Sequence, residues 1–200
     1  MAITNGYCTL AEVKAALRIS DSVDDTLLEN SVEAASRRID GECSRRFYAD
    51  GSATARTYAA DRNDFLFVDD ISTLSGLVVK VDDDSDGTFE TTYTIGSDFQ
   101  VEPSNAIAQG NPVYLLRALD KMFPISDAGR TLVQVTADWG WPSVPDAIRE
   151  ATVLMAARHF KRYESPLGVA GFGDIGAIIV RRIDPDVAML ISPFKRLVIA

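Results

Sequence analysis

The sequence is poor in histidine and cysteine, two residue types on which many catalytic and metal sites depend. It has one histidine, His159, and two cysteines, Cys8 and Cys43, in 200 residues. These cysteines make a poor disulfide framework and cannot form a cysteine metal site alone. Free cysteines are among the most often buried residues, so we expect two buried thiols. P-loop, kinase and nucleophile-elbow motifs are also missing. We therefore expect a protein that is not an enzyme and needs no cofactor.

Long apolar runs are missing as well. No run approaches the roughly 18 residues that a membrane span needs, and the first residues lack the regions of a secretory signal. We therefore expect a chain that folds in a cytoplasm and has no membrane partner. Apolar residues make up 46% and charged residues 24% of the chain, which is ordinary for a folded domain.

Negative charge is concentrated in the middle of the chain. The formal net charge is −9, and eleven acidic residues between Tyr58 and Pro103 are opposed only by Arg62 and Lys80. The rest of the chain has 18 acidic and 18 basic residues, so the whole excess lies in this segment. Because such a segment repels phosphate groups, we do not expect it to bind nucleic acid tightly.

Helical patterns lie at both ends of the chain. The segment Thr9–Glu12 has the spacing of a capping box. A longer helix is predicted next, and a third from Pro145. Asp184 and Pro185 are typical of the cap and first turn of a last short helix. Three- and four-residue spacing predicts the inner faces of the long helices: Leu28, Val32, Ala35, Ile39 and Cys43 on the second, and Ile148, Ala151, Met155 and His159 on the third.

The middle of the chain has the pattern of short strands separated by Asp, Gly, Ser and Asn turns. The predicted strands are 55–58, 65–68, 77–81, 91–94, 99–101 and 131–135. The sequence thus predicts an α+β fold: a small helical bundle, with three main helices and a short C-terminal helix, and an inserted antiparallel β-sheet or small barrel. We expect the helical part to comprise residues 1–52 and 142–200, and the acidic β-rich insertion residues 53–141.

A glycine-rich segment matches the dinucleotide-binding pattern G-x-G-x-x-G at residues 171–176. That fingerprint needs a strand before it and a helix after it. Here a helix precedes and a strand-like run follows. We therefore expect a mobile or interface-forming loop between subunits, made by Gly168, Gly171, Phe172, Gly173, Asp174 and Gly176.

An acidic cluster fits the first half of a calcium-binding loop, with Asp82, Asp84, Asp86 and Gly87 in place. The twelfth position, which should be a bidentate glutamate, is Tyr93. We expect a hairpin turn with solvated carboxylates, and weak calcium binding is the alternative.

Two aromatic features also have two interpretations. We expect His159 to be a packing residue on the inner half of its helix rather than a general base. We expect Trp139 and Trp141 to be packed where the insertion ends, covering the base of the third helix, with stacking on a sugar or base as the alternative.

The C-terminal tail combines apolar and basic residues. It contains Phe194, Lys195, Arg196, Leu197, Val198 and Ile199. Such a tail either docks on its own subunit's core or inserts into a groove of a partner.

Segments at both ends of the chain have a recognisable pattern. They are Tyr7–Leu17, Asp24–Asn30, Ile39–Cys43, Arg46–Phe47, Val144–Ala151, Ala156–Arg162, Ile183–Val187 and Leu190–Arg196. Together they cover roughly half of the chain, and in this order they resemble the head-tail connector (adaptor) family of tailed bacteriophages and phage-like particles.

This resemblance implies a small helical protein that forms a dodecameric ring at the head-tail junction of a virion. One side would dock on the portal protein and the other would receive the stopper or next connector. Double-stranded DNA would pass through the channel without sequence-specific binding, which a neutral or acidic channel favours. The tail, Phe194 to Ile199, would reach the portal. The alternative from the residues alone is a small carbohydrate-binding or hydrolytic domain that uses the β insertion around Trp139 and Trp141.

Overall fold

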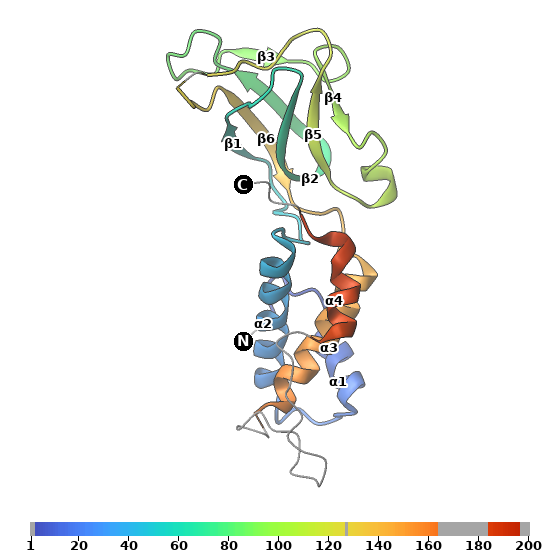
Figure 1. Ribbon diagram of the computed structural model, residues 1–200. Helices are drawn as coiled ribbons and strands as arrows, with labels where there is room; N and C mark the ends of the chain where they lie inside the picture. Colours follow the sequence, from blue (N-terminus) through green and yellow to red (C-terminus); the bar gives the residue numbers. More distant parts are fainter. Residues whose placement is uncertain (1–2, 127, 164–183, 197–200) are drawn as a thin grey trace. The chain divides into compact units, whose positions relative to one another are not determined.

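The computed structural model describes residues 3–126, 128–163 and 184–196, and the chain forms two compact units. The helical unit comprises residues 1–47 and 144–200, and the β unit comprises residues 48–143. The elements of both are shown in Figure 1. The predicted α+β class is confirmed. The β unit thus begins at residue 48 and ends at residue 143, whereas the sequence-based borders are residues 53 and 141.

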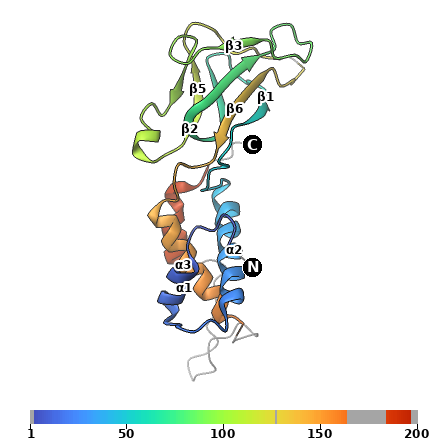
Figure 2. The same ribbon diagram turned by 180° about the vertical axis from the view of Figure 1, so that it is seen from behind.

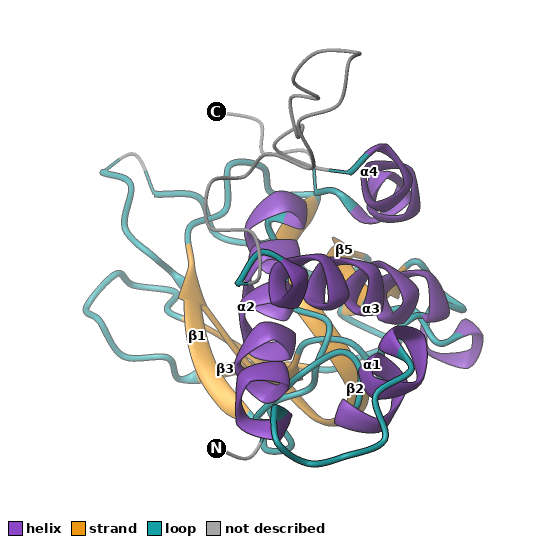
Figure 3. Ribbon diagram, turned by 90° about the horizontal axis from the view of Figure 1, so that it is seen from below, coloured by secondary structure: helices purple, strands orange, loops and turns teal. Residues whose placement is uncertain are grey.

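The helical unit contains four α-helices in its described part. Helix α3 packs along α2, and α1 and α4 lie beside this pair (Figures 1 and 3). A turn of 3-10 helix, η2, follows α4. The bounds are α1 Leu10–Leu17, α2 Asp25–Cys43, α3 Asp146–Lys161, α4 Pro185–Ile191 and η2 Ser192–Phe194.

The helix starts follow the predicted caps closely. The Thr9 hydroxyl accepts a hydrogen bond from the Glu12 amide at 3.2 Å, and the Glu12 carboxylate accepts one from the Thr9 amide at 2.6 Å. These bonds complete a capping box. The bonds that the Thr9 amide and hydroxyl donate to the Glu12 carboxylate hold the pKa of Glu12 below its usual value. Asp184 caps α4, and Pro185 is its first residue, as expected. Pro145 is the N-cap residue of α3, whereas the sequence predicted it as the first residue of the helix.

The predicted inner face of α2 is buried in full, and so are Ile148 and Ala151 of α3. One core cluster joins α1, α2 and α3 through Cys8, Val13, Leu28, Val32, Ala35, Ala156 and Phe160. At the C-terminal end of α2, the Tyr7 hydroxyl donates to Asp40 and accepts from the Phe47 amide at 2.9 Å. Burial raises the pKa of Tyr7 and that of Asp40. The two hydrogen bonds of the Tyr7 hydroxyl connect the N-terminal segment to the C-terminal end of α2.

The β unit is a six-stranded antiparallel sheet (Figure 2). The strand order is β1-β6-β2-β5-β4, and β3 pairs with the end of β2. The sheet is open, with β1 and β4 at its edges, so the small-barrel alternative does not apply. The bounds are β1 Thr54–Tyr58, β2 Phe65–Val81, β3 Thr91–Tyr93, β4 Phe99–Glu102, β5 Val113–Ala118 and β6 Val133–Trp139, with a short 3-10 helix at Ile107–Gln109.

Strand β2 differs most from the sequence expectation. The two predicted strands 65–68 and 77–81 are one strand of 17 residues. Its first part pairs with β5, and its second part pairs with β6 and β3, with register shifts between Ile71 and Val78. Such shifts let one strand bend and change neighbours. Strand β5 was not predicted, because its adjacent leucines, Leu115 and Leu116, break the alternation that marks a strand.

Both cysteines are free and buried, as expected. Burial raises the pKa of the Cys8 thiol to about 12, and the nearby Glu12 carboxylate adds to the shift. Burial also raises the pKa of the Cys43 thiol to about 11, although Lys195 and Arg45 oppose it. The thiolate is the reactive form, so both residues are chemically protected.

Gly140 is a position where the backbone requires glycine. Its φ is +120°, and a Cβ atom there would lie 1.8 Å from the carbonyl oxygen of Tyr48. Gly41, within α2, is surrounded by open space, and a Cβ atom there would meet nothing within 4 Å. A side chain at position 140 would therefore be strained and would clash, whereas position 41 has room for one.

We expect Gly140→Ala to lower the free energy of unfolding of the β unit by more than about 2 kcal/mol, because it adds a backbone clash to a strained conformation. The matched control, Gly41→Ala, should raise stability by about 0.5–1 kcal/mol, because alanine favours a helix interior. Urea denaturation followed by circular dichroism measures both. Equal effects of the two substitutions would contradict the Tyr48–Gly140 contact.

We expect both thiols of the folded protein to react with iodoacetamide at pH 8 about a hundredfold more slowly than in guanidinium chloride, because raised pKa values deplete the thiolate. Mass spectrometry of each cysteine peptide gives the two rates separately. Fast labelling of the native protein at either residue would show that this residue is not buried.

Candidate functional site

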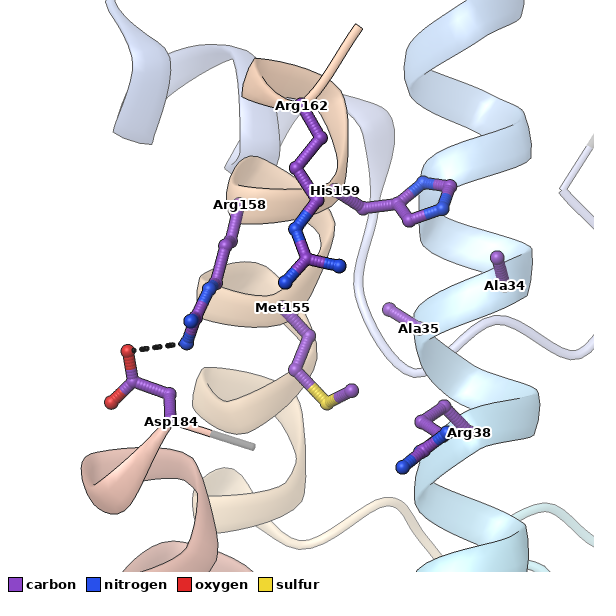
Figure 4. A pocket seen from close by; sticks show the side chains of 8 residues that line it. All are labelled: Ala34, Ala35, Arg38, Met155, Arg158, His159, Arg162 and Asp184. Atoms are coloured by element: carbon purple, nitrogen blue, oxygen red, sulfur yellow. Dashed lines mark hydrogen bonds and ion pairs between the residues drawn. The ribbon is translucent and has the colours of Figure 1, made fainter. Parts of the chain in front are cut away.

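A pocket of about 260 Å³ lies between α2 and α3, close to the start of α4 (Figure 4). We call it the basic pocket. Its floor is apolar and its rim is mostly cationic. The lining residues are Ala34, Ala35, Arg38, Met155, Arg158, His159, Arg162 and Asp184.

Helical spacing brings these side chains together. Met155 and Arg158 of α3 and Arg162, the C-cap residue of this helix, follow at positions i, i+3 and i+7, so they share one face. Ala34 and Arg38 are four residues apart on α2 and share the facing side. The small alanine side chains leave the space into which the long side chains of α3 extend (Figure 4).

Two ion pairs neutralise part of the rim. Arg158 donates to Asp184 at 2.9 Å, and Asp184 also caps α4 by accepting from the Asp186 amide at 3.0 Å. Arg38 pairs with Glu42 at 2.9 Å, one turn further along α2. Within the described ranges, Arg162 makes no ion pair. The pocket therefore keeps an excess of guanidinium groups, which bind carboxylates or phosphates through charge-assisted hydrogen bonds.

His159 does not have the inner position that the sequence predicted. It is exposed at the pocket, and Thr152, Ala156 and Phe160 are buried instead. Its Nδ1 lies 3.4 Å from the hydroxyl oxygen of Ser31. Ser31 is fully buried, and its hydroxyl donates a hydrogen bond to the Leu27 carbonyl at 2.9 Å. Ser31 and His159 therefore do not supply an accessible nucleophile.

The first residues of the tail dock on their own helical unit. Phe194 packs edge-to-face on Phe47, with ring centroids 5.8 Å apart. The Arg196 amide donates to the Cys43 carbonyl at 2.9 Å, and Lys195 pairs with Glu42 at 3.8 Å. Leu197, Val198 and Ile199 lie outside the described residues. So do the glycine-loop residues Gly168, Gly171, Phe172, Gly173, Asp174 and Gly176.

Both tryptophans are buried within the β unit. Trp139 belongs to the core of the sheet, and its indole N–H donates to the Thr54 carbonyl at 2.8 Å. The indole N–H of Trp141 donates to the Asp70 carboxylate at 3.0 Å. Their exposed fractions are 0% and 3%, so neither ring is available to stack on a sugar or a base.

The acidic cluster lies in the loop between β2 and β3, so the predicted hairpin is present. The carboxylate of Asp82 is buried and accepts from the amides of Asp86 and Gly87 at 3.2 and 2.9 Å. Asp84 and Asp86 are exposed, and oxygen atoms of all three residues lie within 4.8 Å of one another. Backbone amides thus bind the one buried carboxylate in the manner of a turn.

Sequence comparison gives one family match. Residues 7–70 match the model of a family described as phage gp6-like head-tail connector protein. This range contains α1, α2, β1 and the start of β2. It confirms the resemblance for the first part of the chain, and the similar segments after residue 144 lie outside it. A search of the curated proteins found no match.

Structural comparison gives matches over the whole chain. One is a chain of the neck of an empty gene transfer agent particle computed with C6 symmetry, with 22% identity and a TM-score of 0.58 over 100% of this chain and 95% of that one. Another is from the neck of the native particle computed with C12 symmetry, with 19% identity and a TM-score of 0.57 over 100% and 94%. A third, from the virion of the native particle, has 21% identity and a TM-score of 0.53 over 100% and 95%. These matches show a shared fold.

We expect Asp184→Ala to lower the free energy of unfolding by about 1–2 kcal/mol, because it removes both the cap of α4 and the ion pair with Arg158. Asp184→Asn should cost less than about 1 kcal/mol, because asparagine also caps helices. Asp186→Ala, in the same turn, should cost about 0.3 kcal/mol through the helix dipole alone. Urea denaturation measures all three. Equal losses in the alanine and asparagine variants would show that the ion pair, and not the cap, stabilises α4.

Proposed function

We propose that this chain is a structural head-to-tail adaptor. It forms a ring on the portal vertex and links the DNA-filled head to the stopper or tail. The observation that carries the proposal is the agreement of two comparisons. The connector family model matches α1 and α2, and the whole chain has the fold of chains in the neck of gene transfer agent particles. The C12 symmetry of one matched neck supports a ring of twelve copies.

The chemistry of the described residues supports a binding role rather than an enzymatic one. The basic pocket offers cations and an exposed histidine without an accessible nucleophile. The burial of Trp139 and Trp141 removes the basis for the carbohydrate-binding alternative. Many weak contacts, multiplied by ring closure, are the mechanism that such a chain would use.

The charge distribution suits DNA in transit. The β unit contains fifteen acidic and six basic residues and therefore carries the whole net charge of −9, while the helical unit has fourteen of each. A channel with a neutral or acidic wall lets the duplex slide without sequence-specific binding. The proposed location is the head-tail junction of a virion, after assembly in the host cytoplasm. Within the described ranges, helices are too short or too polar to cross a membrane.

The tail is the proposed contact with the portal. Because Phe194 and Arg196 are held on α2 and its following residues, they fix where the tail leaves the helical unit. Lys195 is exposed there and carries positive charge. We assign portal contacts to Lys195 and to Leu197, Val198 and Ile199, and contacts between neighbouring subunits to the glycine loop.

Two truncations separate docking from stability. Truncation after Arg196 keeps the Phe194–Phe47 contact, so we expect unchanged thermal stability and at least about a tenfold loss of affinity for the portal protein of the same particle. Truncation after Pro193 should lose both affinity and stability. Biolayer interferometry and thermal denaturation measure the two quantities, with Met189→Ser as a control at an exposed residue. Normal portal binding without residues 197–200 would overturn the docking role of this segment.

Electron microscopy of the chain mixed with its portal tests the adaptor role itself. We expect rings of the chain on the outer end of the portal. Absence of any complex between the two wild-type proteins would overturn the proposed function.

A further inference from the structure

The basic pocket has positive charge that the described residues of its own subunit do not neutralise. Arg162 is exposed and has no ion-pair partner within the described ranges. Glu42 is shared between Arg38 and Lys195, at 2.9 and 3.8 Å, so one carboxylate serves two cations. Asp184 is occupied by Arg158. An anionic group would therefore find free guanidinium donors at this rim.

The size and floor of the pocket favour a protein segment over DNA. A volume of about 260 Å³ admits a few side chains, and a DNA duplex is too wide to enter between two packed helices. The floor of Ala34, Ala35 and Met155 is apolar and suits aliphatic parts of side chains. A peptide loop that carries carboxylates matches both the floor and the rim.

The β unit contains a loop of this kind, residues 82–90 between β2 and β3, which we call the acidic loop. Its exposed carboxylates are Asp83, Asp84, Asp86 and Glu90. No ion pair to any of them is found in the part of the chain that the structure describes. Arg130 is the neighbouring cation, and it donates to the carbonyl of Ser85 at 2.6 Å. The buried carboxylate of Asp82 fixes the backbone of the loop, so its charges are held in place before any partner binds.

A ring needs two different, complementary surfaces on every copy, because each subunit meets its two neighbours through opposite sides. The acidic loop and the basic pocket form such a pair. We infer that the basic pocket of one subunit receives the acidic loop of a second copy, with Arg162 and Arg38 binding its carboxylates. This inference rests on the proposed ring and names the contact that closes it.

Cross-linking between copies tests the contact directly. The variant Lys161→Arg with Arg162→Lys keeps the charge of α3 and moves one amine from outside the pocket to its rim. A carbodiimide joins amines to carboxylates in direct contact, and an equal mixture of ¹⁵N-labelled and unlabelled chains shows by mass spectrometry which products join two copies. We expect cross-links from position 162 to residues 83–90 of another copy in this variant. In the wild type, where position 161 carries the amine, they should be absent.

Charge reversal tests the same contact by function. Arg162→Glu should raise the concentration at which half of the chain is in rings by about tenfold, because like charges would then meet. Asp84→Lys with Glu90→Lys should do the same, and all three substitutions together should restore rings. Lys161→Glu and Asp61→Lys with Asp120→Lys are controls with matched charge changes elsewhere on the same units. Mass photometry with and without the portal counts the rings, and thermal denaturation shows that each variant is folded.

Several results would overturn the inference. Cross-links confined to one chain, or directed to carboxylates outside residues 83–90, would show another occupant. If the triple variant did not recover ring formation, Arg162 would not pair with Asp84 and Glu90. If Arg162→Glu weakened binding to a DNA duplex at low salt and left the rings unchanged, the pocket would bind phosphate groups. Wild-type protein that forms no ring, alone or on the portal, would instead refute the proposed function. In that case cross-links from position 162 to residues 83–90 of a second copy would still support the contact in a smaller oligomer, and their absence would overturn the inference as well.

Discussion

The packing of α2 against α3 is the interaction on which the described helical unit depends. The two helices are separated in sequence by the whole β unit, yet they share one core cluster with Ala35, Ala156 and Phe160. Helix α1 and the start of the chain pack on this pair, and α4 is attached to it through Asp184. The α2–α3 contact forms only when residues far apart in the chain meet. Its formation therefore costs loop-closure entropy, which local helix propensity does not offset.

The outer side of the same helix pair forms the basic pocket, so one contact produces both the core and the candidate site. The alanines at positions 34 and 35 have different roles. Ala35 is buried against the core and also borders the pocket, whereas Ala34 leaves room for the side chains of α3. The short side chains of Ala34 and Ala35 on α2 therefore leave a recess between long side chains of α3 and Arg38 of α2, without breaking the packing beneath it.

The helices could be predicted from sequence far better than the sheet. Caps and three- to four-residue spacing are local signals, and they located α1, α2 and α4 within a few residues. The continuity of β2 depends on pairing with β5, β6 and β3, which no local pattern reveals. His159 was misplaced because its neighbour Phe160 competes for the core, and a larger apolar ring is the better core residue. The pocket could not be predicted because it needs residues of two helices that are far apart in the sequence. The four-residue spacing of Arg158 and Arg162 indicates only that these two side chains lie on one face.

The β unit is connected to the helical unit through neighbouring strands. Thr54 of β1 pairs in register with Ala137 of β6, so the incoming and outgoing chains leave the sheet side by side. The Asp50 amide extends this pairing by donating to the Trp139 carbonyl at 2.9 Å. A mechanical load on the β unit is then divided between the two connecting segments, which leave the sheet at the same end. Such a load pulls both strands in the same direction and does not peel one from the other.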